Sequence, residues 1–196
     1  MSVALPCAVG FRVKSGWAAV VLLAGPKTAP RVLDSRIIEL SDPDVADSRQ
    51  PYHAGFGTAQ SDLAKVARLV RGIERFSRAS LGALIATYRK RGRLRGAGVV
   101  VPSLTDPSTI ASPHMRAHAN EGRLFRTVVL DGVRRSRLPA RFILERDVFE
   151  HLGRALRRPA ARLKAAVTAL GDGVAGRWRA EQKVATAAAW LVLAGA

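Results

Sequence analysis

Acidic residues are scarce in this chain of 196 residues: 15 Asp and Glu stand against 32 Lys and Arg, which gives a formal net charge of +17. A surplus of this size bears on partners rather than on fold, and it favours polyanions such as nucleic acid. Only six of the basic residues are Lys, so base composition in an arginine-rich genome is an alternative source of part of the excess.

Cysteine and long apolar runs are also nearly absent. The single Cys7 excludes an internal disulfide and a zinc site built from cysteines, and it fits the reducing cytoplasm, where we expect the protein to act. The longest apolar stretches, residues 17–25 and 184–196, are shorter than the roughly 20 residues that a membrane-spanning helix needs. The N-terminus does not resemble a signal peptide. We therefore expect neither secretion nor a membrane location.

Three common catalytic motifs are missing. The sequence contains no phosphate-binding Gly-x-x-x-x-Gly-Lys-Ser/Thr loop, no Gly-x-Gly-x-x-Gly after a strand and no Gly-x-Ser-x-Gly elbow. Nucleotide hydrolysis by a phosphate-binding loop, dinucleotide-dependent redox chemistry and serine-hydrolase chemistry are therefore poorly supported.

The first forty residues predict β structure. Residues 4–13 and 16–24 are rich in Val and Leu and are separated by a short polar turn, a pattern typical of a hairpin. Residues 31–40 predict a third strand, so residues 1–40 are expected to form an antiparallel meander. The aspartate-rich residues 41–57 are expected to form an acidic loop.

From residue 58 to the end, the pattern alternates between helices and short apolar strands within what we expect to be one domain over residues 1–196. The expected strands are residues 97–101 and 139–144, and the expected helices are residues 58–88, 113–135, 147–157, 161–170 and 178–193. Ser112 and Pro113 suit the cap and first turn of the second helix. This order predicts an α/β fold: a mixed five-stranded sheet, three antiparallel strands then two parallel strands, with helices on both faces.

Two segments carry a resemblance to a known superfamily. Residues 10–18 (GFRVKSGWA) look like the first hairpin of the ribonuclease H-like superfamily, in particular its RuvC-like Holliday-junction resolvase branch. Residues 181–189 (EQKVATAAA) are similar to the alanine-rich last helix of resolvases. The order of elements is that of the same fold. The resemblance implies a ribonuclease H-like domain that acts on nucleic acid.

The same resemblance implies two-metal catalysis, with carboxylates on the first strand, at the end of the fourth strand and on the last helix. Two divalent ions need several anionic oxygens to hold them. The first-strand acid should fall near Val9 or Gly10, the fourth strand ends before Ser103, and neither position offers a carboxylate. Only Glu181 is suitably placed, with Asp106 as a nearby substitute. A standard nuclease that uses Mg²⁺ or Mn²⁺ is therefore disfavoured, and no cofactor is certain.

The densest polar group outside those positions lies on the helix expected from residue 113. Helical spacing places His114, His118 and Glu121 on one face, where they could bind a transition metal or act as a base with an orienting acid. Met115 excludes the zincin pattern. The structural alternative is that the three side chains only contact one another along the helix. His53 and His151 are isolated and have no partner that the sequence identifies.

The best candidate for polyanion binding is the run that follows the first long helix. Tyr88 could stack on a base, and the cations beside it neutralise phosphates: Arg89, Lys90, Arg91, Arg93 and Arg95. Arg116 and Arg126 are further candidates for phosphate contacts. The alternative is a helix C-terminus, where the helix dipole favours cations. Residues 61–100 carry ten cations and two anions, and this clustering favours a binding face.

Three hypotheses follow. The first is a nucleic-acid-binding protein with a catalytically degenerate resolvase-like domain. The second is a metal-dependent nuclease or phosphoesterase whose site is rebuilt from Asp106, His114, His118, Glu121 and Glu181. The third is a basic module that docks on an acidic protein. A homodimer is an open possibility in each case.

Overall fold

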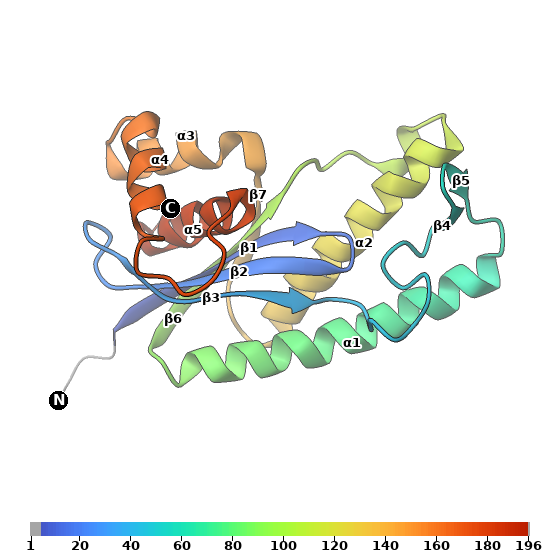
Figure 1. Cartoon of the computed structure of the whole chain (residues 1–196), viewed down its shortest axis with the longest axis horizontal. Coiled ribbons are helices and arrows are strands. Elements are labelled where there is room, and N and C mark those ends of the chain that lie inside the picture. The colour runs from blue at the N-terminus through green and yellow to red at the C-terminus, as the bar shows by residue number, and fades with distance from the viewer. Residues whose placement is uncertain (1–4, 196) are drawn as a thin grey trace.

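A mixed five-stranded sheet forms the centre of the molecule in the computed structural model, which describes residues 5–195 (Figure 1). Its strand order is β3-β2-β1-β6-β7. The strands β1 (Pro6–Lys14), β2 (Trp17–Ala24) and β3 (Arg31–Glu39) pair antiparallel. The strands β6 (Arg93–Val101) and β7 (Ala140–Leu144) run parallel to β1. The predicted sheet, three antiparallel strands then two parallel ones, is confirmed.

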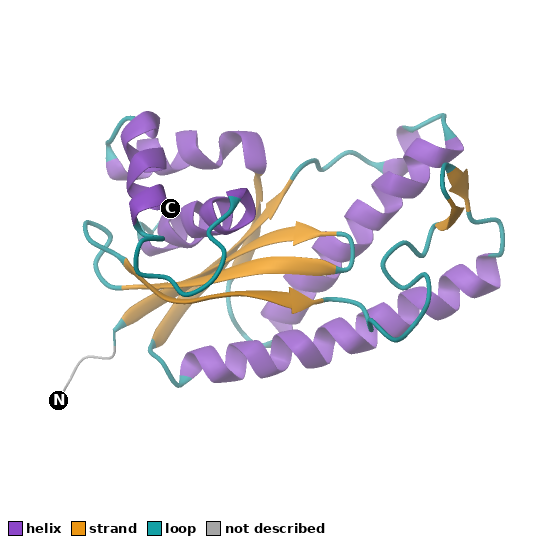
Figure 2. Cartoon of the chain, viewed as in Figure 1, coloured by secondary structure: helices purple, strands orange, loops and turns teal. Residues whose placement is uncertain are grey.

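Helices cover both faces of this sheet, as predicted (Figure 2). One face packs against α1 (Leu63–Arg89) and α2 (Pro113–Arg135). The other face packs against α3 (Val148–Leu156), α4 (Ala160–Ala169) and α5 (Ala180–Leu193). None of the helices in residues 5–195 is long and apolar enough to cross a membrane.

Successive side chains of β1 point to opposite faces of the sheet, so this strand contributes to both hydrophobic cores. Val9 and Phe11 point towards α1 and α2, whereas Ala8 points towards α5. Between them, Gly10 lies directly under α5: a Cβ atom built at residue 10 would stand 1.8 Å from the backbone oxygen of Ala185. The alanine-rich sequence of α5 therefore permits a close approach of helix to sheet, and that approach requires glycine at residue 10.

The observed boundaries differ from the predicted ones in two informative places. The end of the expected acidic loop and the two residues after it form a small hairpin of β4 (His53–Gly55) and β5 (Thr58–Ala59). Because residues 58–59 belong to this hairpin, α1 begins later than predicted, where the carboxylate of Asp62 accepts a hydrogen bond from the backbone N–H of Lys65. The predicted cap of α2 is confirmed, because the Ser112 hydroxyl accepts from the N–H of Met115 and Pro113 occupies the first turn.

The molecule is elongated because α1 and the first half of α2 extend beyond the sheet (Figure 1). The β4–β5 hairpin lies against α2 in this extension. We call this part, made of β4, β5 and the N-terminal halves of α1 and α2, the distal end. It holds His53, His114 and His118.

Candidate metal centre and nucleic-acid interface

The carboxyl ends of β1, β6 and β7 meet at one edge of the sheet, where the resemblance to resolvases implies metal-binding acids. We call it the carboxyl edge. Gly10 has no room for a side chain, and Val9 is buried in the opposite core. The next side chain of β1 that faces α5 is a cation, the buried Arg12. Its Nη2 donates to Oε2 of Glu145, just after β7, at 2.5 Å, and its Nη1 donates to the carbonyl of Val13 at 2.6 Å.

The second acid at the carboxyl edge also faces a cation. Glu181, in the first turn of α5, lies 3.7 Å from Nζ of Lys14 at the end of β1. Glu145 and Glu181 are therefore each charge-compensated by a side chain of β1. A carboxylate that already faces a fixed cation binds a divalent ion less strongly, because the cation repels the ion.

Asp106 does not join either acid. Its carboxylate caps a short 3₁₀ helix, Pro107–Thr109, by accepting from the N–H of Ser108 at 3.0 Å. It also lies 3.6 Å from Nη1 of Arg123. The hydrogen bond from Ser108, assisted by nearby arginines, lowers the pKa of Asp106. The observed contacts of this residue are those of a loop cap.

Three histidines meet at the distal end. His114 and His118 lie one turn apart on α2, with their Nε2 atoms 3.2 Å apart. The ring of His53, from β4, lies over both: its centroid is 4.4 Å from that of His118 and 5.3 Å from that of His114. One ring nitrogen of each of the three lies within 4.8 Å of the others. These residues could hold one metal ion.

Glu121 is buried beside the three histidines and contacts His53, but it is not one of the three residues that could bind the metal directly. Its side chain is buried, and its Oε1 accepts a hydrogen bond from Nδ1 of His53 at 2.7 Å. Its Oε2 lies 3.9 Å from Nδ1 of His118, one turn earlier on α2. Burial raises the pKa of Glu121, although the His53 hydrogen bond opposes the shift. The group expected from the sequence, His114, His118 and Glu121, thus becomes three histidines with Glu121 behind them.

The pKa of His118 is lowered, first by partial burial and then by the neighbouring rings of His53 and His114. The shift favours the neutral imidazole, which is the form that binds metals. Sequence reasoning missed His53, because β4 is far from α2 in the chain and a lone histidine in a loop carries no spacing signal.

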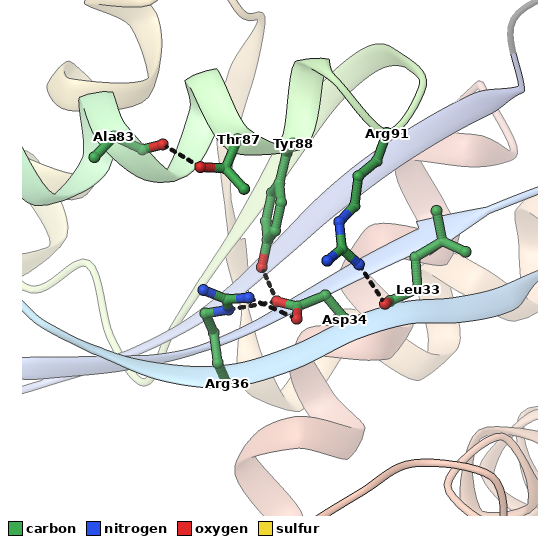
Figure 3. Close-up of polar contacts among 7 residues, drawn as sticks. All are labelled: Leu33, Asp34, Arg36, Ala83, Thr87, Tyr88 and Arg91. Atoms are coloured by element: carbon green, nitrogen blue, oxygen red, sulfur yellow. Dashed lines mark hydrogen bonds and ion pairs between the residues drawn. The ribbon is translucent and has the colours of Figure 1, made fainter.

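Tyr88 corrects the expectation of a base-stacking residue. It has no exposed surface, and its hydroxyl donates to Oδ2 of Asp34 on β3 at 2.5 Å (Figure 3). Asp34 also accepts two hydrogen bonds from Arg36, whose guanidinium lies 5.9 Å from the ring centroid of Tyr88. Burial, together with Asp34, raises the pKa of Tyr88. Because the ring is enclosed between α1 and β3, it cannot stack on a base.

The basic residues that follow Tyr88 are exposed and lie at the opposite edge of the sheet, where β6 and β7 begin. Arg89 donates to the carbonyl of Ser136, and Arg91 donates to that of Leu33 at 3.0 Å. The first contact brings the end of α1 to the end of α2. We call the resulting group the amino-edge cluster; its members are Arg89, Lys90, Arg91, Arg93, Arg95, Arg134, Arg135, Arg137 and Arg141.

Arg116 and Arg126 lie outside this cluster and hold a loop. Arg116 donates to the carbonyl of Ile110 at 2.8 Å, and Arg126 donates to that of Ser103 at 3.0 Å. Partial burial, with Arg123 nearby, lowers the pKa of Arg126. Both guanidinium groups donate hydrogen bonds to backbone carbonyls between β6 and α2. That the N–H groups not used in these bonds contact phosphates remains a prediction.

Solved structures resemble this arrangement. RuvC of T. thermophilus in complex with a Holliday junction substrate has a TM-score of 0.57 and 13% identity, covering 94% of this chain and 90% of that one. Another structure of Thermus thermophilus RuvC has a TM-score of 0.56, again with 13% identity, and covers 94% and 92%. No family model and no curated protein matches the sequence. The chain has the ribonuclease H-like fold.

Within the ribonuclease H-like fold, the three groups described above lie in separate places. The carboxyl edge holds the Arg12–Glu145 and Lys14–Glu181 pairs. The amino-edge cluster lies at the other end of the parallel strands, and the histidines lie at the distal end (Figure 1). Neither Asp106 nor Glu181 is among the residues whose ligand atoms lie within 4.8 Å of one another at the distal end.

Proposed function

We propose that this protein binds nucleic acid through a basic surface and is a catalytically degenerate relative of the RuvC-like resolvases. The observation that carries the proposal is the concentration of exposed cations with no acidic partner. Within residues 5–195, no member of the amino-edge cluster forms an ion pair with an Asp or Glu side chain.

The exposed face of α1 extends this surface. Its cations also lack acidic partners among the described residues, and they follow the helix from the distal end towards the amino edge: Arg68, Arg71, Arg75 and Arg78. A strip of exposed guanidinium groups can neutralise backbone phosphates without reading bases. Unpaired cations bind phosphates more strongly than paired ones, because no carboxylate has to be displaced.

The solved structures support the class of partner. One of the similar structures is RuvC in complex with a Holliday junction substrate, and the match covers 94% of this chain. At 13% identity that likeness speaks for the fold, so the transfer of nucleic-acid binding to this chain is part of the proposal.

The residues at the carboxyl edge support the proposal that two-metal catalysis has been lost. Two-metal catalysis of phosphodiester cleavage needs several carboxylates around two ions. Arg12 and Lys14 place positive charge beside Glu145 and Glu181, respectively. Residue 10 cannot carry an acid because α5 occupies the space. We therefore propose binding without two-metal cleavage.

The test is fluorescence anisotropy with labelled duplex DNA, single-stranded DNA, a four-way junction and RNA, between about 50 and 200 mM salt. The variant combines Lys90→Ala, Arg93→Ala and Arg95→Ala, three exposed residues of the amino-edge cluster. The control removes the same charge elsewhere through Arg49→Ala, Arg154→Ala and Lys65→Ala, whose side chains face carboxylates.

Wild type is expected to bind at low salt and to lose affinity steeply as salt rises. The cluster variant should lower the slope of log K against log salt by about two to three, because each phosphate contact contributes about 0.9. The control should change it by less than one. Absence of binding at low salt, or an equal effect of both triple variants, contradicts the proposal. Binding to acidic proteins in place of nucleic acid would favour the docking-module hypothesis.

The catalytic half of the proposal has its own assay. A labelled four-way junction is incubated with the protein and about 10 mM Mg²⁺ or Mn²⁺, an excess over the affinity of ordinary carboxylate sites. No cleavage is expected above a protein-free control. Cleavage that depends on Glu145 and Glu181 would show that the acids work despite their cationic neighbours, and the chain would then be a nuclease.

A further inference from the structure

We propose that His53, His114 and His118 bind one divalent transition metal ion, ordinarily Zn²⁺, at the distal end. Glu121 holds His53 in the binding orientation. The inference does not depend on the proposed nucleic-acid binding. The ion differs in kind and place from the magnesium pair of a resolvase.

The distance between the α2 nitrogens is that of two ligands on one ion. With Zn–N bonds of about 2.0–2.1 Å and tetrahedral angles, two ligand nitrogens lie roughly 3.3–3.4 Å apart. The Nε2 atoms of His114 and His118 are 3.2 Å apart, and one ring nitrogen of each of the three histidines lies within 4.8 Å of the others. A small movement of the His53 ring towards these two nitrogens would complete the site.

A second observation, independent of the distance between the α2 nitrogens, comes from His53. The residue is 6% exposed, and its Nε2 is buried with no hydrogen-bond partner among the described residues. A hydrogen bond between the Nε2 atoms of His114 and His118 would leave this nitrogen unpaired, and Nδ1 of His114 is likewise buried without a partner among the described residues. A buried polar atom without a partner destabilises the folded state, and metal coordination would remove that penalty.

Glu121 fixes which nitrogen of His53 is free. Its carboxylate accepts the Nδ1 proton at 2.7 Å, so the lone pair is on Nε2 of a ring that lies beside those of His114 and His118. Metal-ligating histidines generally donate their other N–H to a carboxylate or a carbonyl in this way. Its second oxygen lies 3.9 Å from Nδ1 of His118, too far for a hydrogen bond, so the acid orients His53 directly.

The donor set selects the metal. Three neutral imidazoles with no thiolate suit Zn²⁺, Co²⁺, Ni²⁺ and Cu²⁺, whereas Mg²⁺ and Mn²⁺ prefer oxygen ligands. Because the side chain of His118 is partly exposed, the site opens to solvent on that side, and a fourth ligand such as water can enter.

The consequence for the fold is a cross-link. His53 is in the β4–β5 hairpin, and the other two ligands are in the first turns of α2. One ion would therefore fasten the segment between β3 and α1 to α2. Binding to the folded state alone raises its stability, so zinc should raise the melting temperature.

The test uses untagged full-length protein that has been stripped with a chelator and dialysed. Zinc binding is measured by calorimetry, Co²⁺ binding by visible absorption, and thermal unfolding with and without zinc. His118→Ala removes the most exposed ligand and is expected to keep the fold. His151→Ala, which removes a histidine of α3 far from the site, is the matched control.

One zinc per chain is expected, with a melting temperature about 5–10 °C higher at 100 times Kd. His118→Ala should lower the affinity at least about 100-fold and abolish the Co²⁺ spectrum, while His151→Ala leaves both unchanged. Absence of binding, or equal binding by the two variants, overturns the proposal. A positioning role of Glu121 predicts that Glu121→Gln weakens zinc about 10–100-fold but keeps the tetrahedral Co²⁺ bands.

Discussion

The hydroxyl of Tyr88 provides a sharp test of whether this residue belongs to the fold or to a nucleic-acid surface. Tyr88→Phe removes one oxygen and keeps the ring that fills the space between α1 and β3. The oxygen donates to Asp34, whose carboxylate is largely buried and also receives two hydrogen bonds from Arg36 (Figure 3). The substitution therefore isolates a single charge-assisted hydrogen bond.

The expected loss of stability follows from that bond. Hydrogen bonds to charged groups contribute about 1.5–3 kcal/mol, and the retained salt link to Arg36 keeps Asp34 partly satisfied. We therefore expect Tyr88→Phe to lower the free energy of unfolding by about 2 kcal/mol. For a chain of this size, that corresponds to a fall in melting temperature of roughly 4–8 °C.

The assay is urea unfolding followed by circular dichroism, with DNA anisotropy on the same preparations. The midpoint should fall at an unchanged m-value, and DNA affinity should stay within about twofold of wild type. Thr87→Val, at a neighbouring exposed position of α1, is the control, since its hydroxyl bonds only the carbonyl of Ala83 in its own helix. Unchanged stability with weaker DNA binding would refute the assignment of Tyr88 to the fold.

Three further predictions concern the same sheet, each measured by urea unfolding. Gly10→Ala should cost about 3 kcal/mol or more, because its Cβ meets the backbone of Ala185 at 1.8 Å; a loss below about 1 kcal/mol would contradict the packing. Arg12→Ala should cost about 2 kcal/mol by leaving Glu145 unpaired, and Arg12→Lys less; no loss would mean that the pair is unimportant. Burial alone would raise the pKa of Asp34, but its hydrogen bonds outweigh this and lower the pKa, so its stabilisation is present above the unfolded-state pKa near 4 and is lost as pH falls through the folded value. The stability difference between wild type and Asp34→Asn should therefore shrink in acid, and a constant difference would count against the assignment.

The sheet and the main helices could be predicted because their signals are local. Valine-rich runs mark β1, β2 and β6, and Ser112 followed by Pro113 marks the start of α2. The helical periodicity of α1 also indicated that Tyr88 is buried. This residue follows Leu81, Leu84 and Ile85 at helical spacing, so it shares their buried face. The neighbouring basic run made a surface role look attractive, but the helical period was the better guide.

The histidine group and the Arg12–Glu145 pair could not be predicted, because each joins segments distant in the chain. The β4–β5 hairpin is short and mostly exposed, so no apolar alternation marks its strands. Without that hairpin, nothing in the sequence relates His53 to Glu121. The sequence shows that residue 12 is an arginine. It does not show which face of the sheet the side chain points to, which depends on the pleat of β1, or its partner, which depends on where β7 ends.

The contrast between the carboxyl edge and the distal end has a simple electrostatic basis. At the carboxyl edge, the guanidinium of Arg12 supplies within the chain the positive charge that a divalent ion would otherwise bring to Glu145. The charge of Glu145 is therefore compensated within the chain. At the distal end, a buried carboxylate orients His53, yet no cation or donor of the described residues meets its Nε2. An ion there would satisfy a nitrogen that the described residues leave unpaired, so the local charges oppose magnesium at the carboxyl edge and favour the proposed zinc at the distal end.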